Sequence, residues 1–213
     1  VSKSTETESF KKYKELKGSP CAYKIYKGCK RKWMNVSDGE RGSAGISVLW
    51  PDVNNETFRD ALRDAESSDK PNNISPAIVY SLEEGVRALW LGDMENDYMV
   101  AIEDDIALSP VDILFAPHHG RKSGRVPKTW LDKLEPRLIV VGEAPSDELD
   151  YYSNYNTLTQ NSAGDILFCC EAGKTHVYVG SPSYSVNFLG EDPNAPRVKG
   201  ALRYLGSFDC GDR

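Results

Sequence analysis

A succession of short apolar runs constrains the fold of this 213-residue chain more than any other feature. Four of these runs have the length of strands: residues 77–82, 87–91, 111–116 and 138–141. The tight turn Glu83-Glu84-Gly85 joins the first two and predicts a hairpin. Two intervening stretches are predicted to be helices: residues 94–106 and 128–134. The order strand, strand, helix, strand, helix, strand predicts a layered α/β protein.

Further elements are predicted on both sides of this central part. We expect helices at residues 9–16 and 56–65, strands at 21–26 and 45–50, and a hairpin formed by 165–170 and 176–179. After Gly180 the composition turns to Ser, Pro, Gly and Asn with little periodicity, which predicts an irregular C-terminal extension. The chain therefore divides into a basic N-terminal segment (1–45), an α/β core (46–180) and an extended tail (181–213).

The charge of the chain is unevenly distributed. A net charge of −6 and a pI near 5.2 exclude a protein whose whole surface is committed to nucleic acid. Between Lys11 and Lys32, however, nine cations face the single acid Glu15. Such a run is either a solvated face or a patch that binds phosphate groups.

Cysteine content and hydropathy predict the compartment. The five cysteines are odd in number and form no Cys-x-x-Cys pair, as expected for reduced thiols of an intracellular protein. No apolar stretch approaches the roughly 20 residues that cross a bilayer, and no signal peptide is recognised. We expect a cytoplasmic protein without a membrane partner.

Polar side chains with metal-binding capacity follow two of the predicted strands. Asp93 ends the run that begins at Leu89, and His118 and His119 end the run that begins at Asp112. Carboxylate and imidazole groups are ligands of divalent zinc, manganese and iron. Arg121, Lys122 and Ser123 come next and offer two cations and a hydroxyl to a phosphate.

Each of these features also has an ordinary structural explanation. A Gly-Asp pair after a strand is commonly a turn or a helix cap. In a His-His pair, one histidine often does not bind the metal and only donates a hydrogen bond to a residue that does. The order of the Gly-Asp and His-His pairs along the chain favours a metal site more than either pair does alone. The third histidine, His176, lies in an alternating strand and is predicted to be structural.

The runs Asn73-Ile74-Ser75-Pro76-Ala77-Ile78-Val79-Tyr80, Leu89-Trp90-Leu91-Gly92-Asp93 and Asp112-Ile113-Leu114-Phe115-Ala116-Pro117-His118-His119-Gly120 together resemble a known family. They are similar to the C-terminal half of the αββα metallo-β-lactamase sandwich, most closely to the hydrolase domain of ComEC-type competence proteins and its stand-alone relatives. The resemblance covers roughly residues 46–180. It implies two divalent metal ions, zinc or manganese, with Asp93 bridging both and either His118 or His119 binding one.

The chain also departs from this family. Its principal ligands lie in a His-x-His-x-Asp-His motif of the N-terminal half, and these 213 residues contain no such motif. Where related domains often carry His-Pro, this sequence reads Asn154-Tyr155-Asn156-Thr157. We therefore expect either a C-terminal piece completed by an N-terminal half, on the same or a separate chain, or a degenerate relative without a metal site. Because Asp93 and the histidine pair are retained, we favour the C-terminal piece over the degenerate relative.

Three functions are compatible with these observations. The first is a metal-dependent phosphodiesterase or nuclease acting on nucleic acid or nucleotides, with Asp93 and His118 as catalytic residues and Arg121, Lys122 and Ser123 as substrate contacts. The second is a catalytically silent module that binds a protein or nucleic acid through the basic segment. The third, a hydrolase of thioesters or lactams, is disfavoured by the cations after the histidine pair.

Overall fold

The computed structural model describes residues 7–212 except 38, 41, 69 and 201. Its α-helices are α1 (Glu8–Lys17), α2 (Glu56–Ser68), α3 (Asn96–Ala101), α4 (Lys128–Leu134) and α5 (Gln160–Ala163). Its strands are β1 (Ile46–Trp50), β2 (Ala77–Ser81), β3 (Arg87–Trp90), β4 (Ile113–Phe115), β5 (Leu138–Val141), β6 (Thr157–Thr159), β7 (Ile166–Glu171), β8 (Lys174–Val179) and β9 (Arg203–Asp209). Short 3₁₀ helices are η1 (Asn72–Ile74), η2 (Pro117–Gly120), η3 (Lys122–Gly124) and η4 (Ser146–Tyr152).

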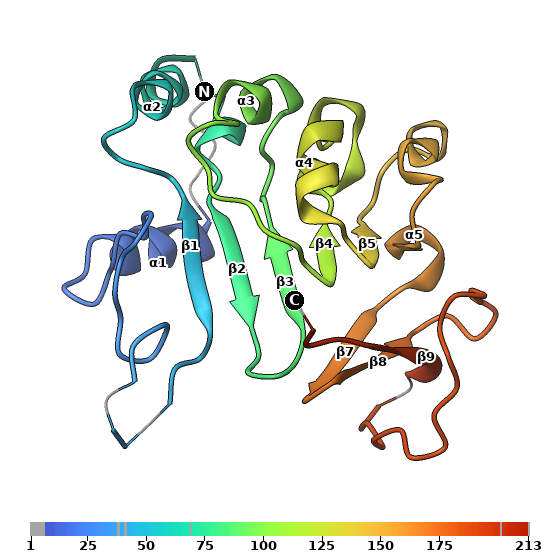
Figure 1. Ribbon diagram of the computed structural model, residues 1–213. Helices are drawn as coiled ribbons and strands as arrows, with labels where there is room; N and C mark the ends of the chain where they lie inside the picture. Colours follow the sequence, from blue (N-terminus) through green and yellow to red (C-terminus); the bar gives the residue numbers. More distant parts are fainter. Residues whose placement is uncertain (1–6, 38, 41, 69, 201, 213) are drawn as a thin grey trace.

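The strands form two sheets, which confirms a mixed α/β architecture. The larger sheet has the order β1-β2-β3-β4-β5-β6. Pairing is antiparallel from β1 to β3 and parallel from β3 to β6. The smaller sheet, β7-β8-β9, is antiparallel throughout. Figure 1 shows α2, α3 and α4 along the top of the view and β7–β9 at the lower right.

Two hydrophobic cores lie on opposite faces of the larger sheet. On one face, Leu89 and Leu114 pack with apolar residues of α2, α3 and α4. On the other face, Ala88 and Ile113 pack with residues of the smaller sheet, including Val177. Because successive residues of a strand point to opposite faces, each parallel strand serves both cores. The result is three layers: helices, the six-stranded sheet and the three-stranded sheet.

Helix α4 shows how local sequence fixes one of these layers. Its Trp130, Leu131 and Leu134 are buried at helical spacing against the first core. The helix stops at Glu135, which adopts a left-handed conformation with φ 40°, and the following Pro136 cannot continue it. The short connection returns the chain directly to β5, where all four residues are buried.

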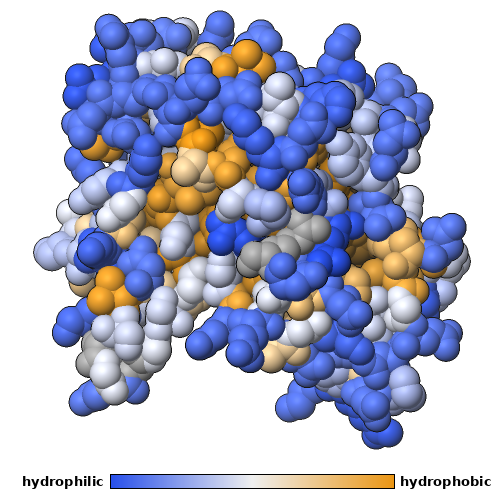
Figure 2. All heavy atoms as spheres, viewed as in Figure 1, coloured by the Kyte–Doolittle hydropathy of each residue, from blue (hydrophilic) through white to orange (hydrophobic). Residues whose placement is uncertain are grey.

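Apolar side chains also reach the surface. On the face seen in Figure 1, Figure 2 shows them gathered over the upper parts of β1 and β2, while most of the rim is hydrophilic. No helix of the described residues is both long enough and apolar enough to span a bilayer.

Several predicted elements differ from the structure. Residues 21–26 form no strand. Turns flank this stretch, in which the N–H of Ala22 donates to the Ser19 carbonyl and the Tyr26 carbonyl accepts from Cys29, and no described strand pairs with it. The helix predicted over 94–106 is limited to α3. The prediction of an irregular C-terminal extension is wrong for β9, which pairs with β8 along its whole length. The short strand β6 was not predicted.

Candidate functional site

The loops that follow β3 and β4 lie side by side at one edge of the larger sheet. The two strands are parallel and adjacent, with Trp90 paired to Phe115, so their carboxyl ends emerge together. The backbone N–H of His118 donates to the carbonyl oxygen of Gly92 at 2.9 Å and ties the loops to each other. The N–H of Asp93 donates to Ser75 Oγ at 3.0 Å and fixes the start of its loop.

Asp93 and His119 line the same cleft, which we call the Asp93–His119 cleft. It has a volume of about 480 Å³. Part of its lining is aromatic: the rings of Trp90 and Phe115 stack with centroids 4.5 Å apart, and Phe168 of β7 meets Phe115 edge to face. The side chains of Asp93 and His119 are exposed to solvent. The cleft therefore combines an accessible carboxylate and imidazole with aromatic residues from both sheets.

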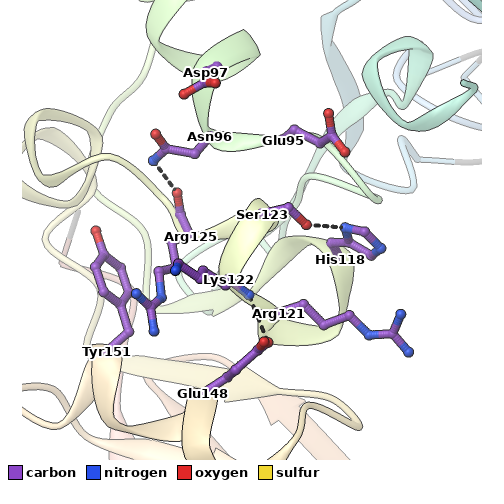
Figure 3. Close-up of a pocket in the computed structure, with 10 residues that line it drawn as sticks. All are labelled: Glu95, Asn96, Asp97, His118, Arg121, Lys122, Ser123, Arg125, Glu148 and Tyr151. Carbon is purple, nitrogen blue, oxygen red and sulfur yellow. Dashed lines mark hydrogen bonds between the residues drawn. The ribbon is translucent and has the colours of Figure 1, made fainter.

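His118 faces a second cavity of about 740 Å³, which we call the Arg125 cleft (Figure 3). Its Nδ1 lies 2.9 Å from Ser123 Oγ. Arg121, Lys122 and Ser123 line this cleft with His118, so the structure brings the predicted phosphate contacts together. These three residues therefore lie beside His118, in a different cleft from Asp93 and His119.

The electrostatics of the Arg125 cleft depend on residues that the sequence did not single out. The Arg125 guanidinium lies 4.9 Å from the ring centre of Tyr151, and burial raises the pKa of Tyr151 above its ordinary value. Glu148 accepts a hydrogen bond from the backbone N–H of Lys122 at 2.8 Å. Arg125 follows the predicted contacts closely in sequence, whereas Tyr151 and Glu148 lie in η4, for which no periodic signal was available.

Backbone geometry at the histidine pair is unusual. His118 has φ 49° and ψ 42°, and His119 has φ 60° and ψ 11°, so two successive non-glycine residues are left-handed. Such conformations cost of order 1–3 kcal/mol each and are concentrated at functional sites. Gly142 permits this arrangement, since a Cβ there would lie 3.1 Å from both Cα and Cβ of His119.

This strain leads to a stability prediction. His119→Gly is expected to raise the free energy of unfolding by about 0.5–1 kcal/mol, because glycine adopts positive φ without steric cost and the exposed imidazole buries little surface. Chemical denaturation measures the change. The matched control is Glu66→Gly at an exposed position of α2, which should lower the free energy of unfolding by a similar amount. A lower stability of His119→Gly would contradict the strain argument.

The metal centre that the resemblance implies requires several donors in one place. Within the described part of the chain, no group of three or more His, Cys, Asp and Glu side chains could hold a metal ion. Zinc sites usually take three or four protein ligands. Asp93 and His119 are two candidate donors, fewer than such a zinc site usually takes.

His176 occupies a different environment. It is buried in β8, with Nε2 3.0 Å from Glu171 Oε1 and Nδ1 3.4 Å from Tyr204 hydroxyl. These contacts join β8 to the two strands beside it, as a structural role requires.

Comparison with known proteins gives no family assignment. No protein-family model matches the chain, and no curated protein matches it either. The site must therefore be interpreted from its own geometry.

Proposed function

We propose that this chain contributes half of a metal-dependent phosphodiesterase site of the metallo-β-lactamase type. The observation that carries the proposal is that Asp93 and His119 line one cleft at the ends of adjacent parallel strands. In this proposal Asp93 and His119 are the metal ligands of this half, and zinc or manganese are the ions. The remaining ligands come from a segment outside this sequence, on the same or a separate chain.

Substrate binding is assigned to the neighbouring Arg125 cleft. Arg121, Lys122 and Arg125 line this cleft with the acids Glu95, Asp97 and Glu148. None of the three cations makes an ion pair among the described residues, so each can contact a phosphate oxygen although the lining as a whole is mixed in charge. Ser123 and His118 add hydrogen-bonding groups to the same cleft. A phosphodiester is favoured over a thioester or lactam, because its anionic oxygens are the groups that Arg121, Lys122 and Arg125 can bind.

Metal binding by the chain itself tests the assignment of ligands. Titration with Zn²⁺ against a chromophoric chelator should show weak binding that falls by at least about tenfold in Asp93→Asn and in His119→Ala, a loss that even outer-shell changes produce. His118→Ala and Asp104→Asn, an exposed aspartate elsewhere, serve as controls and should bind as the unmodified chain does. Equal affinity in all four variants would refute the proposed ligand pair.

The second candidate function is a module that binds a partner without catalysis. It is favoured by the incomplete donor set and by the cations between Lys11 and Lys32. A chain that binds no Zn²⁺ in the titration above, yet binds nucleic acid in a salt-sensitive manner, would support this function over the first.

A further inference from the structure

The N-terminal segment exposes aromatic rings to an unusual degree. We call residues 10–33 the basic aromatic segment. Its five aromatic residues are all exposed, with these fractions: Phe10 48%, Tyr13 56%, Tyr23 56%, Tyr26 42% and Trp33 61%. Helix α1 overlaps the beginning of this segment, and none of its residues is buried. A folded chain normally covers large rings, so their exposure along one continuous segment indicates an interaction surface.

Cations alternate with these rings. Lys11 and Lys12 are paired within α1, to Glu8 and Glu15, but four exposed lysines form no ion pair among the described residues: Lys17, Lys24, Lys30 and Lys32. The guanidinium of Arg31 lies over the ring of Tyr23. In a chain with a net charge of −6, this segment is a local concentration of positive charge.

The segment is fixed to the fold even though its rings are exposed. The Lys27 backbone N–H donates to the carbonyl of Pro51 at 2.8 Å, and its Nζ donates to the carbonyl of Asp105 at 3.0 Å. Cys29 and Met34 are buried against Val48 of β1. These contacts fix the part of the segment from Lys27 onward, which precedes Trp33, beside β1 at the left of Figure 1.

This surface lies on the same side of the sheet as the Asp93–His119 cleft. Val48 pairs with Ile78, and Ile78 pairs with Trp90, so all three side chains point to one face. Val48 contacts the basic aromatic segment, and Trp90 lines the cleft. Two strand spacings, about 10 Å, separate β1 from β3.

We propose that the basic aromatic segment is a binding surface for single-stranded nucleic acid. Exposed rings such as Trp33 and Tyr26 offer stacking platforms to unpaired bases, and Arg31 over Tyr23 adds a planar cation. The unpaired lysines offer contacts to the phosphates between the bases. Duplex bases are already stacked and cannot use the rings. A lipid surface is less well matched, because three of the five rings lie outside α1 and not along one face of a helix. The proposal does not require metal binding or catalysis.

Fluorescence anisotropy with a labelled 20-nucleotide oligo-dT, in EDTA to exclude metal, tests this surface. The chain should bind this strand at least about tenfold more tightly than a 20-base-pair duplex. Trp33→Ala should weaken binding by at least about fivefold, as expected for the loss of one stacked base. The triple variant Lys24→Gln/Lys30→Gln/Lys32→Gln should reduce the slope of log affinity against log salt by about 2.

Matched substitutions separate this surface from general effects of charge or stability. Lys199→Gln, an exposed lysine of the C-terminal region, and Val100→Ala, an exposed apolar residue of α3, should leave binding unchanged. Circular dichroism verifies that each variant is folded. The proposal is overturned if the duplex binds as tightly as the single strand, if folded Trp33→Ala binds normally, or if the chain binds only vesicles of anionic phospholipid. Because EDTA removes free metal ions, none of these outcomes depends on whether Asp93 and His119 bind metal.

Discussion

Asp93→Asn is expected to lower phosphodiester hydrolysis by at least about 10³-fold in the protein assembled with all its metal ligands. The substitution keeps the shape of the side chain and removes the negative charge that holds the metal in the proposed site. Charge stabilisation by a bound metal is worth several kcal/mol, which corresponds to a rate factor of this size. Hydrolysis of bis-p-nitrophenyl phosphate, followed at saturating Zn²⁺ or Mn²⁺, measures the effect.

The comparison for this experiment is Asp104→Asn. This aspartate is exposed and lies outside both clefts, so its neutralisation should change the rate by less than about threefold. His119→Ala should follow Asp93→Asn. If Asp93→Asn retained more than a tenth of the rate, Asp93 would not be a metal ligand, and the binding module would become the better account of the chain.

Asp112→Ala is expected to have the largest effect on stability, lowering the free energy of unfolding by about 3 kcal/mol. Asp112 is fully buried at the start of β4. Its carboxylate accepts from Arg137 Nε at 3.0 Å and from the backbone N–H of Arg87 at 2.8 Å. Removing the carboxylate leaves the partly buried N–H of Arg87 without that acceptor. It also leaves the partly buried Arg137 guanidinium without this carboxylate, although Arg137 still pairs with Asp212.

Urea denaturation of two further variants separates the buried charge from the hydrogen bonds. Asp112→Asn keeps an acceptor oxygen and should lose about half as much stability. Asp132→Ala removes a solvent-exposed partner of Lys128 and should lower the free energy of unfolding far less than Asp112→Ala does. A loss below about 1 kcal/mol in Asp112→Ala would show that this network contributes little to the fold.

The sequence predicted those elements whose signals are local. The β2–β3 hairpin, α4 and β5 were all predicted close to their observed bounds, because a turn, a helical apolar face and a buried run each lie within a few residues of sequence. The strand β9 was missed because its pairing partner β8 lies more than 20 residues earlier in the chain. The region after Gly180 has little periodicity, so its sequence gives no sign of that long-range pairing.

The candidate site was likewise predicted in part from the sequence and in part only from the structure. Residue types and spacing alone identified Asp93, the two histidines and the three polar residues that follow them. Sequence left open which histidine accompanies Asp93, because neighbouring residues in a turn point in directions that the backbone decides. The left-handed conformation of both histidines, held by the packing of their loop against Gly142, directs His119 to the cleft of Asp93 and His118 to that of Arg125.

The sequence by itself thus determined the α/β class, the strand-tip positions of the polar residues and the basic character of the N-terminal segment. These follow from periodicity and residue type, which are properties of neighbouring positions. Only the tertiary structure decided the division into two clefts, the incorporation of β9 and the placement of the basic aromatic segment on the face that carries Trp90. Each of these depends on contacts between residues distant in sequence, and such contacts exist only once the chain has folded.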